Sequence, residues 1–378
     1  MSDTIPFLSL QQQHEPLLEN LHNAALRVID SGIYINGPET DAFSHELSSL
    51  LGLDNVVAVS NGLDAIRLIL RGYIELGKLQ PGQEVILPSN TYIASVLPVV
   101  ENALVPVLVK PDLRTFGLDW EDAKRHISEH TGAVMTVHLY GTPSWDFSVA
   151  EEFRKNGILI IEDNAQAIGA SLTAPDGTIM YTGALGNAAA FSFYPTKNIG
   201  ALGDAGAVAT KDGNLARVVE ALKNYGSTKR YYNDFTGFNC RMDEIQAALL
   251  REKLKLLKEL TKARNEAALH YDKAISNKSV VKPEIIPGMT QVWHQYVVRV
   301  KNRESLRKRL ADQGISTDVH YPVSLFDQSC FRNGETMLKG DKDSREMSRQ
   351  LAEEVISLPI ANIKPEGIER ISHIINTH

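Results

Sequence analysis

Short apolar runs alternate with helical patterns through the first 210 residues of this chain, and this alternation leaves few possible folds. The runs are apolar throughout and do not alternate with polar residues, as is typical of strands covered by helices on both faces. Such strands form a mostly parallel sheet. We therefore predict an α/β fold with a sheet of about seven strands, at residues 56–60, 84–88, 105–109, 133–139, 158–162, 188–193 and 205–210.

The connection between the last two of these runs is short. Eleven residues lie between Phe193 and Ala205, whereas a crossover between parallel strands normally takes a dozen or more. We expect the last strand to run antiparallel to the one before it, so that the sheet is mixed.

The segment from Arg241 to Ile275 contains no Gly or Pro and keeps its apolar residues at helical spacing. This pattern predicts one long helix, which could join two domains. We predict a large α/β domain over residues 1–245 and a smaller C-terminal α+β domain over residues 246–378.

Charge and hydropathy argue against two classes of partner. The formal net charge is −7, whereas binding to nucleic acid needs clustered positive charge. The N-terminus has no apolar export segment, and no apolar run reaches the roughly 18 residues of a membrane span. We expect a cytoplasmic protein that binds neither nucleic acid nor membrane.

The metal-binding residue types are scattered along the chain. The two cysteines, Cys240 and Cys330, provide neither a disulfide framework nor zinc-site spacing. His138, His294 and His320 lie far apart and match no metal-ligand motif. We expect no metal site.

Three predicted strand ends carry groups that could bind a ligand, and open α/β sheets bind ligands at the carboxyl ends of their strands. After the first strand, Asn61 and Gly62 open a helix whose free N–H groups suit a phosphate. Tyr92 opens the helix after the second strand, and Asp163 and Gln166 follow the strand at 158–162. A phosphate cradle, an aromatic face and a carboxylate should therefore meet at one edge of the sheet.

A single lysine, Lys197, lies in the stretch FSFYPTKNIGALGDAGAVAT at residues 191–210, among aromatic, small and glycine residues. Two interpretations are open. Lys197 is either an ordinary loop lysine, or a lysine whose chemistry requires the neutral amine that an apolar neighbourhood favours.

These motifs, in this order and spacing, resemble those of the DegT/DnrJ/EryC1/StrS family of nucleotide-sugar aminotransferases, which are pyridoxal-phosphate enzymes of fold type I. The resemblance covers nearly the whole chain. It is carried by GIYINGPETDAF (32–43), SNGLDA (60–65), PSNTYIAS (88–95), VHLYGTP (137–143), EDNAQAIGA (162–170), FSFYPTKNIGALGDAGA (191–207), GFNCRMDEIQAALL (237–250) and VHYPV (319–323).

The resemblance implies pyridoxal 5'-phosphate as cofactor, with pyridoxamine phosphate as its second form, and it assigns catalytic roles. Lys197 would bind the cofactor aldehyde covalently and then carry a proton as general acid and base. Asp163 would keep the pyridine nitrogen protonated. Gln166 would donate a hydrogen bond to the phenolic oxygen of the cofactor.

The resemblance also implies the remaining contacts of the cofactor. Tyr92 would stack on the ring, and Gly62, Leu63 and Ser192 would bind the phosphate. Asn239 would reach that phosphate from a second copy of the chain, which makes the enzyme a homodimer. Many relatives have Gly-Thr where this chain has Gly62-Leu63, so backbone amides and Ser192 must replace a hydroxyl.

Structural alternatives exist for several of these residues. Asp163 could be a helix N-cap or turn residue, Tyr92 a core aromatic, and Asn239 the N-cap of the long helix. His320 and Tyr321 resemble a segment near the sugar-nucleotide site, but a structural role is as well supported.

The resemblance implies a reaction in which L-glutamate aminates a nucleotide-linked ketosugar. The motifs SNGLDA, PSNTYIAS and HYPV are similar to those of the subgroup acting on dTDP-3-oxo-6-deoxyhexoses. This points to formation of a dTDP-3-amino-3,6-dideoxyhexose for lipopolysaccharide O-antigen or another glycan. The alternatives are a 4-aminotransferase acting on a UDP- or dTDP-4-oxo sugar, and a non-catalytic regulatory protein that retains the fold.

Overall fold

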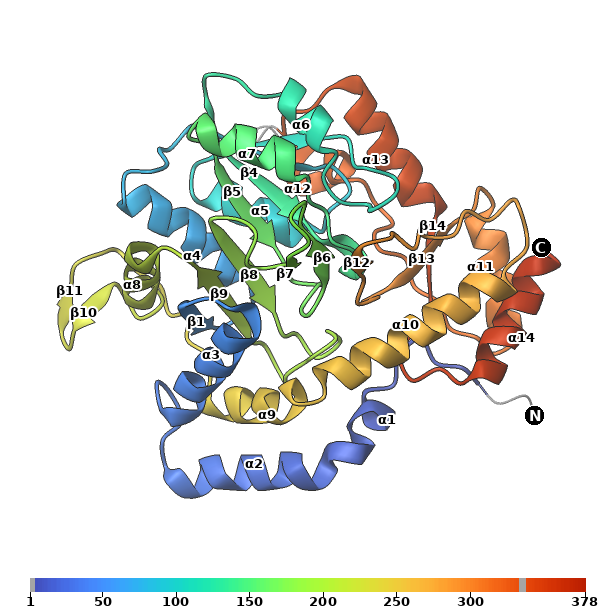
Figure 1. The fold of residues 1–378 in the computed structure, drawn as a ribbon, viewed down its shortest axis with the longest axis horizontal. Coiled ribbons are helices and arrows are strands. Elements are labelled where there is room, and N and C mark those ends of the chain that lie inside the picture. Colours follow the sequence, from blue (N-terminus) through green and yellow to red (C-terminus); the bar gives the residue numbers. More distant parts are fainter. Residues whose placement is uncertain (1–3, 333–337) are drawn as a thin grey trace.

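A computed structural model gives the structure of residues 4–332 and 338–378, and its centre is a seven-stranded sheet (Figure 1). The strand order is β1-β9-β8-β5-β4-β2-β3. All neighbours are parallel except β9, which is antiparallel to both β1 and β8. This confirms the mixed, mostly parallel sheet. The strands are β1 (Asn55–Val59), β2 (Glu84–Pro88), β3 (Val105–Val109), β4 (Thr131–Val137), β5 (Leu159–Asp163), β8 (Ala188–Ser192) and β9 (Gly206–Thr210).

Helices cover both faces of the sheet, which explains why its strands are apolar throughout. In β8, Ala188 and Ala190 face one core, whereas Ala189 and Phe191 face the core on the other side. The first core is closed by α4 (Gly62–Glu75), α5 (Ile93–Glu101) and α8 (Gly213–Leu222). The opposite face is covered by α3 (Pro38–Leu51), α6 (Trp120–Arg125), α7 (Phe147–Lys155) and α9 (Glu244–Leu254).

The single helix predicted over 241–275 is wrong, because the chain forms two helices there. α9 ends at Leu254, and α10 (Leu257–Ala274) begins after a break at Lys255 and Leu256. Ala247 and Leu250 of α9 pack on the main sheet, whereas Ala268 and Tyr271 of α10 pack in a separate C-terminal core. The apolar residues of α9 thus pack in one core and those of α10 in another. The break between the helices allows each of them to orient its apolar face towards its own core.

The C-terminal core is a smaller α+β unit. It contains the antiparallel pair β13 (Tyr296–Arg299) and β14 (Val355–Leu358), packed with α10, α11 (Arg303–Asp312) and α14 (Pro365–Asn376). Between β13 and β14 the chain returns to the main sheet, where Leu325, Phe326 and Leu338 join the core that also contains α4. The division at residues 245 and 246 stays a prediction.

Further elements complete the structure, most of them short, and they were not predicted individually from the sequence. Three strands form a small sheet in the order β12-β6-β7, and β10 and β11 form a hairpin that projects from one end of the molecule (Figure 1). Within the described ranges, no helix has the length and apolar character needed to cross a bilayer. The elements are α1 (Leu10–His14), η1 (Glu15–Leu17), α2 (Leu18–Ser31), η2 (Leu139–Gly141), β6 (Ser171–Thr173), β7 (Ile179–Tyr181), β10 (Ser227–Lys229), β11 (Tyr232–Asn233), β12 (Met289–Thr290), η3 (Leu325–Asp327), α12 (Ser329–Arg332) and α13 (Lys342–Glu354).

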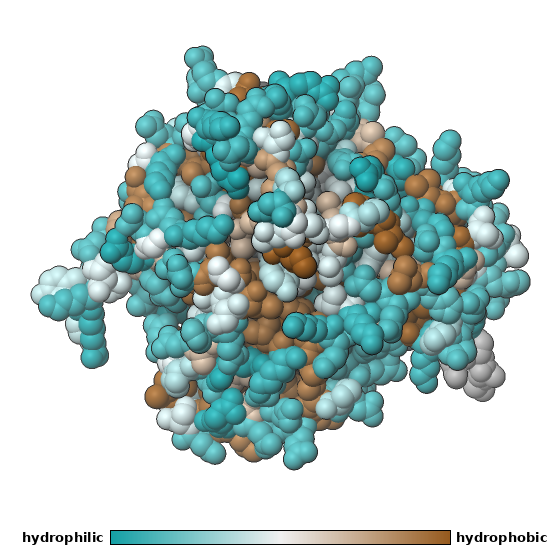
Figure 2. All heavy atoms as spheres, in the orientation of Figure 1, coloured by the Kyte–Doolittle hydropathy of each residue, from teal (hydrophilic) through white to brown (hydrophobic). Residues whose placement is uncertain are grey.

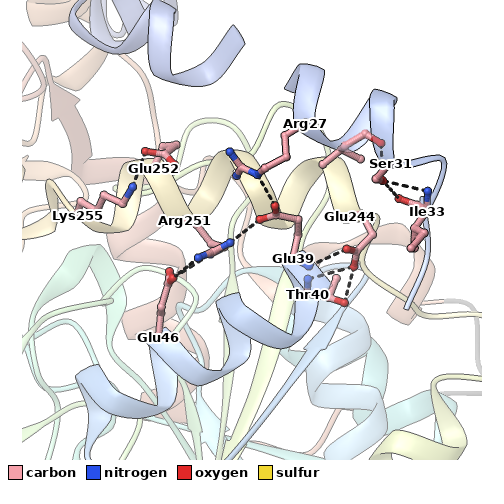
Figure 3. Close-up of polar contacts among 11 residues, drawn as sticks. Arg27, Ser31, Ile33, Glu39, Thr40, Glu46, Glu244, Arg251, Glu252 and Lys255 are labelled. Atoms are coloured by element: carbon pink, nitrogen blue, oxygen red, sulfur yellow. Dashed lines mark hydrogen bonds and ion pairs between the residues drawn. The ribbon is translucent and has the colours of Figure 1, made fainter. Parts of the chain in front are cut away.

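Polar contacts tie the N-terminal helices α2 and α3 to α9 (Figure 3). The buried Glu244 carboxylate accepts hydrogen bonds from the backbone N–H groups of Gly37, Glu39 and Thr40 at 2.7 to 3.1 Å, and from the Thr40 hydroxyl at 2.6 Å. Glu244 therefore caps the N-terminus of α3 from another helix, a position where a negative charge also interacts favourably with the helix dipole.

Replacing Glu244 by alanine should lower the free energy of unfolding by roughly 2 to 4 kcal/mol, because it leaves buried N–H groups without an acceptor. Urea denaturation of the purified protein measures this. Glu252, on the same helix, pairs with the exposed Lys255 (Figure 3), so Glu252→Ala should cost under about 1 kcal/mol. Equal effects of the two substitutions would contradict the capping role.

Candidate active site

A cavity of about 510 Å³ opens where the carboxyl ends of the parallel strands meet. This is the edge at which the sequence analysis expected a ligand. Nearly all of the residues proposed there line the cavity; the exception is Asn239. The lining includes Gly62, Leu63, Tyr92, Asp163, Gln166, Ser192, Lys197, His320 and Tyr321.

Lys197 lies in the tight loop between β8 and β9. Its backbone N–H donates to the carbonyl of Tyr194 at 2.8 Å, and Ala201 N–H donates to Phe193 O at 2.8 Å, which folds the loop back on itself. Burial lowers the pKa of the Lys197 amine to about 8, while the negative Asp163 carboxylate opposes that shift. The amine is therefore much closer to its neutral, nucleophilic form than a solvated lysine.

Asp163 is the last residue of β5 and is buried, with 6% of its surface exposed. Its Oδ2 accepts a hydrogen bond from Ser95 Oγ at 2.6 Å, and its Oδ1 accepts one from Ala165 N–H at 3.1 Å. Ser95 Oγ also lies 2.7 Å from Thr91 Oγ1. Ser95 belongs to the PSNTYIAS motif but was not expected in the site, and the structure shows that it orients the carboxylate.

Gln166 and Tyr321 connect the sheet to the C-terminal part of the chain. Gln166 Oε1 accepts from Tyr140 N–H at 2.7 Å, and Gln166 Nε2 donates to the Tyr321 hydroxyl at 3.1 Å. The Tyr321 ring stacks on Tyr92, with centroids 4.8 Å apart. Tyr92 is 50% exposed, so its alternative interpretation as a core aromatic is wrong.

The N-terminus of α4 lies directly against the end of β8. A Cβ atom at Gly62 would lie 2.7 Å from Ser192 Cβ, and one at Gly206 would lie 2.4 Å from the Asn61 carbonyl. Glycine at both positions allows this approach. Asn61 caps the helix by accepting from Asp64 N–H at 2.8 Å. Free N–H groups of the first turn and the Ser192 hydroxyl thus form a cradle suited to a phosphate.

Several lining residues were not proposed as part of the site, and His294 and Gln295 are among them. His294 Nδ1 lies 3.2 Å from Oδ1 of Asn198, the residue that follows Lys197 in the chain. Burial and the nearby positive charges of Lys197 and Arg264 hold the pKa of His294 well below its usual value, so the ring is neutral. In the described parts of the chain, no cluster of three or more His, Cys, Asp or Glu could hold a metal ion.

Asn239 does not line this cavity in the single chain. It is exposed and forms an isolated β-bridge with Asn224. α9 begins at Glu244 with Asp243 as its N-cap, so the interpretation of Asn239 as a helix cap is wrong.

The residues present fit pyridoxal phosphate on structural grounds. The cavity combines a lysine with a lowered pKa, a buried and oriented carboxylate, an exposed aromatic ring and a backbone cradle from which a Cβ atom is excluded. These groups match the aldehyde, the ring nitrogen, the ring face and the phosphate of that cofactor.

Comparison with known proteins agrees with this set of groups in the cavity. The profile of the DegT/DnrJ/EryC1/StrS aminotransferase family matches residues 17–376. The dTDP-3-amino-3,6-dideoxy-alpha-D-galactopyranose transaminase of Aneurinibacillus thermoaerophilus is 41% identical over 99% of both chains. Other similar proteins carry names that specify UDP-linked sugars.

Solved structures share the whole fold. The structure of S. venezuelae DesV, in complex with a ketimine intermediate, has a TM-score of 0.91 and 37% identity, and the match covers 99% of this chain and 98% of DesV. The structure of NtdA from Bacillus subtilis contains pyridoxamine phosphate as bound cofactor; it has a TM-score of 0.86 and 26% identity, over 100% and 86% of the two chains.

Proposed function

The chain belongs to the DegT/DnrJ/EryC1/StrS aminotransferase family and is a pyridoxal-phosphate-dependent transaminase, and from this premise we propose its reaction. It transfers the amino group of L-glutamate to carbon 3 of a dTDP-linked 3-oxo-6-deoxyhexose. The observation that carries this proposal is the meeting of Lys197, Asp163 and Gln166 in one cavity. The similarity to the A. thermoaerophilus transaminase supports the sugar.

The roles of the residues follow from their environments. When bound, pyridoxal phosphate supplies an aldehyde and an electron-withdrawing ring. Lys197 would hold the cofactor by condensing its amine with the aldehyde, with loss of water. Once the amino group of the substrate has displaced it, the freed Lys197 amine would take a proton from the carbon that carries that amino group. Asp163 would supply a negative charge to the ring nitrogen, and Gln166 Nε2, which donates to Tyr321 here, would donate to the phenolic oxygen.

The other lining residues position the cofactor and the sugar. Gly62 and Leu63 offer backbone N–H groups to the phosphate, and Ser192 offers its hydroxyl. Tyr92 supports the ring face. His320 and Tyr321 enter the same cavity from the C-terminal part of the chain, and we assign them to contact with the sugar nucleotide. The product is an aminosugar that serves lipopolysaccharide or other glycan synthesis.

Incubation with individual ketosugars tests the reaction. The purified protein is mixed with L-glutamate and either a dTDP-3-oxo-6-deoxyhexose, a dTDP-4-oxo-6-deoxyhexose or a UDP-4-oxo sugar, and the product is examined by mass spectrometry and NMR. We expect amination only of the 3-oxo sugar. Amination of a 4-oxo sugar would support the 4-aminotransferase alternative. A protein that binds the cofactor but aminates none of them would support the regulatory alternative.

We also propose that the enzyme is a homodimer in which Asn239 completes the cavity of the partner. Asn239 is exposed and outside its own cavity. Large apolar side chains are exposed on α2 and just after it, including Leu26, Ile29 and Tyr34 at 53%, 54% and 56%. Figure 2 shows hydrophobic surface on the lower part of the face where Figure 1 places α2 and α9. Exposed apolar surface of this kind supports a subunit interface.

Mixed dimers test the contribution of Asn239. Lys197→Ala and Asn239→Ala subunits should each have low activity alone. Co-expression should restore about one quarter of the wild-type activity, because half of the dimers are mixed and each has one intact cavity. An Asn239 that served only its own chain would give no recovery above the activity of Asn239→Ala itself.

A further inference from the structure

A second cavity, of about 470 Å³, lies behind the loop that carries Lys197. Its walls come from η1, the junction of α9 and α10, and the segment before α14, and the loop contributes Asn198 and Gly200. Asn198 Oδ1 lies 3.2 Å from the Nδ1 atom of His294, which lines the active-site cavity. The two cavities therefore lie on opposite sides of one short segment.

Lys253 of α9 lines this second cavity and is buried, with 5% of its surface exposed. Its Nζ donates to the carbonyl of Gly200 at 2.5 Å and lies 2.8 Å from His14 Nε2. Both partners are neutral acceptors, and no described carboxylate forms an ion pair with Lys253. A buried cation without a counter-ion is unfavourable. Burial accordingly lowers the pKa of Lys253 to about 8.

The rest of the lining combines apolar side chains, Pro16, Leu17, Leu256 and Leu260, with one further cation and several hydrogen-bonding groups. Lys364 faces the same space, as do His14 and the amides of Gln12 and Asn362, whereas Glu15 is the one carboxylate among the described lining residues. Burial, followed by the neighbouring charge of Lys253, lowers the pKa of His14. What the cavity lacks is a negative group next to Lys253.

We propose that this cavity binds a small oxyanion, a phosphate or a carboxylate, with Lys253 as its buried counter-charge and Lys364 at its rim. The third N–H of the Lys253 ammonium has no acceptor among the described residues and is available to the anion. Lys253 also donates to the carbonyl of Gly200, which lies three residues after Lys197. An anion bound to Lys253 would therefore contact the side chain that holds the loop carrying Lys197. The site is independent of the sugar specificity proposed above.

Calorimetric titration of the holoenzyme tests the site, since bound pyridoxal phosphate already fills the cofactor's phosphate cradle. Inorganic phosphate and glutarate are titrated separately, at an ionic strength held constant with sodium chloride. We expect saturable binding of at least one of them, weakened tenfold or more in Lys253→Met. Lys255→Met is the matched control, because Lys255 lies two positions further along and pairs with Glu252 at the surface. It should bind like the wild type.

Each other result overturns the proposal. Absence of saturable binding to the wild type would mean that Lys253 serves only to hold Gly200. Binding that survives unchanged in Lys253→Met would belong to the active-site cavity. If Lys253→Met does not fold, Lys364→Ala decides: we expect its affinity to fall several-fold, and an unchanged affinity counts against the site.

Discussion

Replacing Lys197 by alanine should lower kcat by about four orders of magnitude without unfolding the protein. Proton transfer by a positioned base contributes roughly 10²- to 10⁴-fold, and loss of the covalent link that we propose between Lys197 and the cofactor would add to this. Lys197 is the only lysine among the described residues that line the cavity. The neighbouring imidazoles are already engaged, because His294 contacts Asn198 and His320 Nδ1 contacts Ser357 Oγ.

The measurement combines kinetics with absorption. Wild-type protein should be yellow with bound cofactor and should lose that colour with L-glutamate, whereas Lys197→Ala with added cofactor should not lose its colour with L-glutamate. Lys211→Ala, at an exposed position just after β9, is the control and should behave like the wild type. If Lys197→Ala kept activity within tenfold of the wild type, another group would have to carry the proton.

The pKa of Lys197 gives this prediction a pH dependence. Only the neutral amine attacks an aldehyde, and burial places the pKa near 8. Covalent capture of pyridoxal phosphate by the apoenzyme should therefore accelerate as the pH rises through about 8, and level off above it. A rate that climbed only near pH 10, as for a solvated lysine, would contradict the effect of burial.

The sheet and most of the active site follow from the sequence because they depend on local signals. Apolar runs give the strands, and residues such as Asn61, Tyr92 and Asp163 lie at or shortly after their carboxyl ends. Once the strands are parallel, their carboxyl ends must meet at one edge. The short link between β8 and β9 likewise gives the direction of β9 from chain length alone.

The rest depends on contacts between segments that are distant in sequence. The break between α9 and α10 contains no Gly or Pro and arises because two cores need different helix faces. The hydrogen bond of Ser95 to Asp163 spans 68 residues and that of Gln166 to Tyr321 spans 155. The spacing of apolar residues along the sequence does not indicate which distant side chains form such pairs. The role proposed for Asn239 would require a second chain, so it lies beyond what a pattern in a single chain can indicate.

Replacing Asp163 by asparagine should lower kcat by about 10²- to 10³-fold, the cost of removing one preorganised charge at the reacting group. Asparagine keeps the size of the side chain and an oxygen that can accept from Ser95 Oγ, so the fold should be unaffected. What it loses is the negative charge that, as proposed above, would keep the ring nitrogen protonated. The protein should still bind the cofactor through Lys197 and turn yellow.

Variants at Ser95 separate the charge of Asp163 from its orientation. Ser95→Ala keeps the carboxylate but removes its 2.6 Å hydrogen bond. Hydrogen bonds to charged groups are worth about 1.5 to 3 kcal/mol, so kcat should fall by about one to two orders of magnitude. Ser95→Thr keeps the hydroxyl and should stay near the wild-type value. Steady-state kinetics with L-glutamate should therefore rank the variants Ser95→Thr, Ser95→Ala and Asp163→Asn in order of increasing loss of kcat.

If Asp163→Asn were nearly as active as the wild type, the carboxylate would not act at the ring nitrogen. If Ser95→Thr and Ser95→Ala were equally impaired, the packing around Ser95, and not its hydroxyl, would be what positions Asp163.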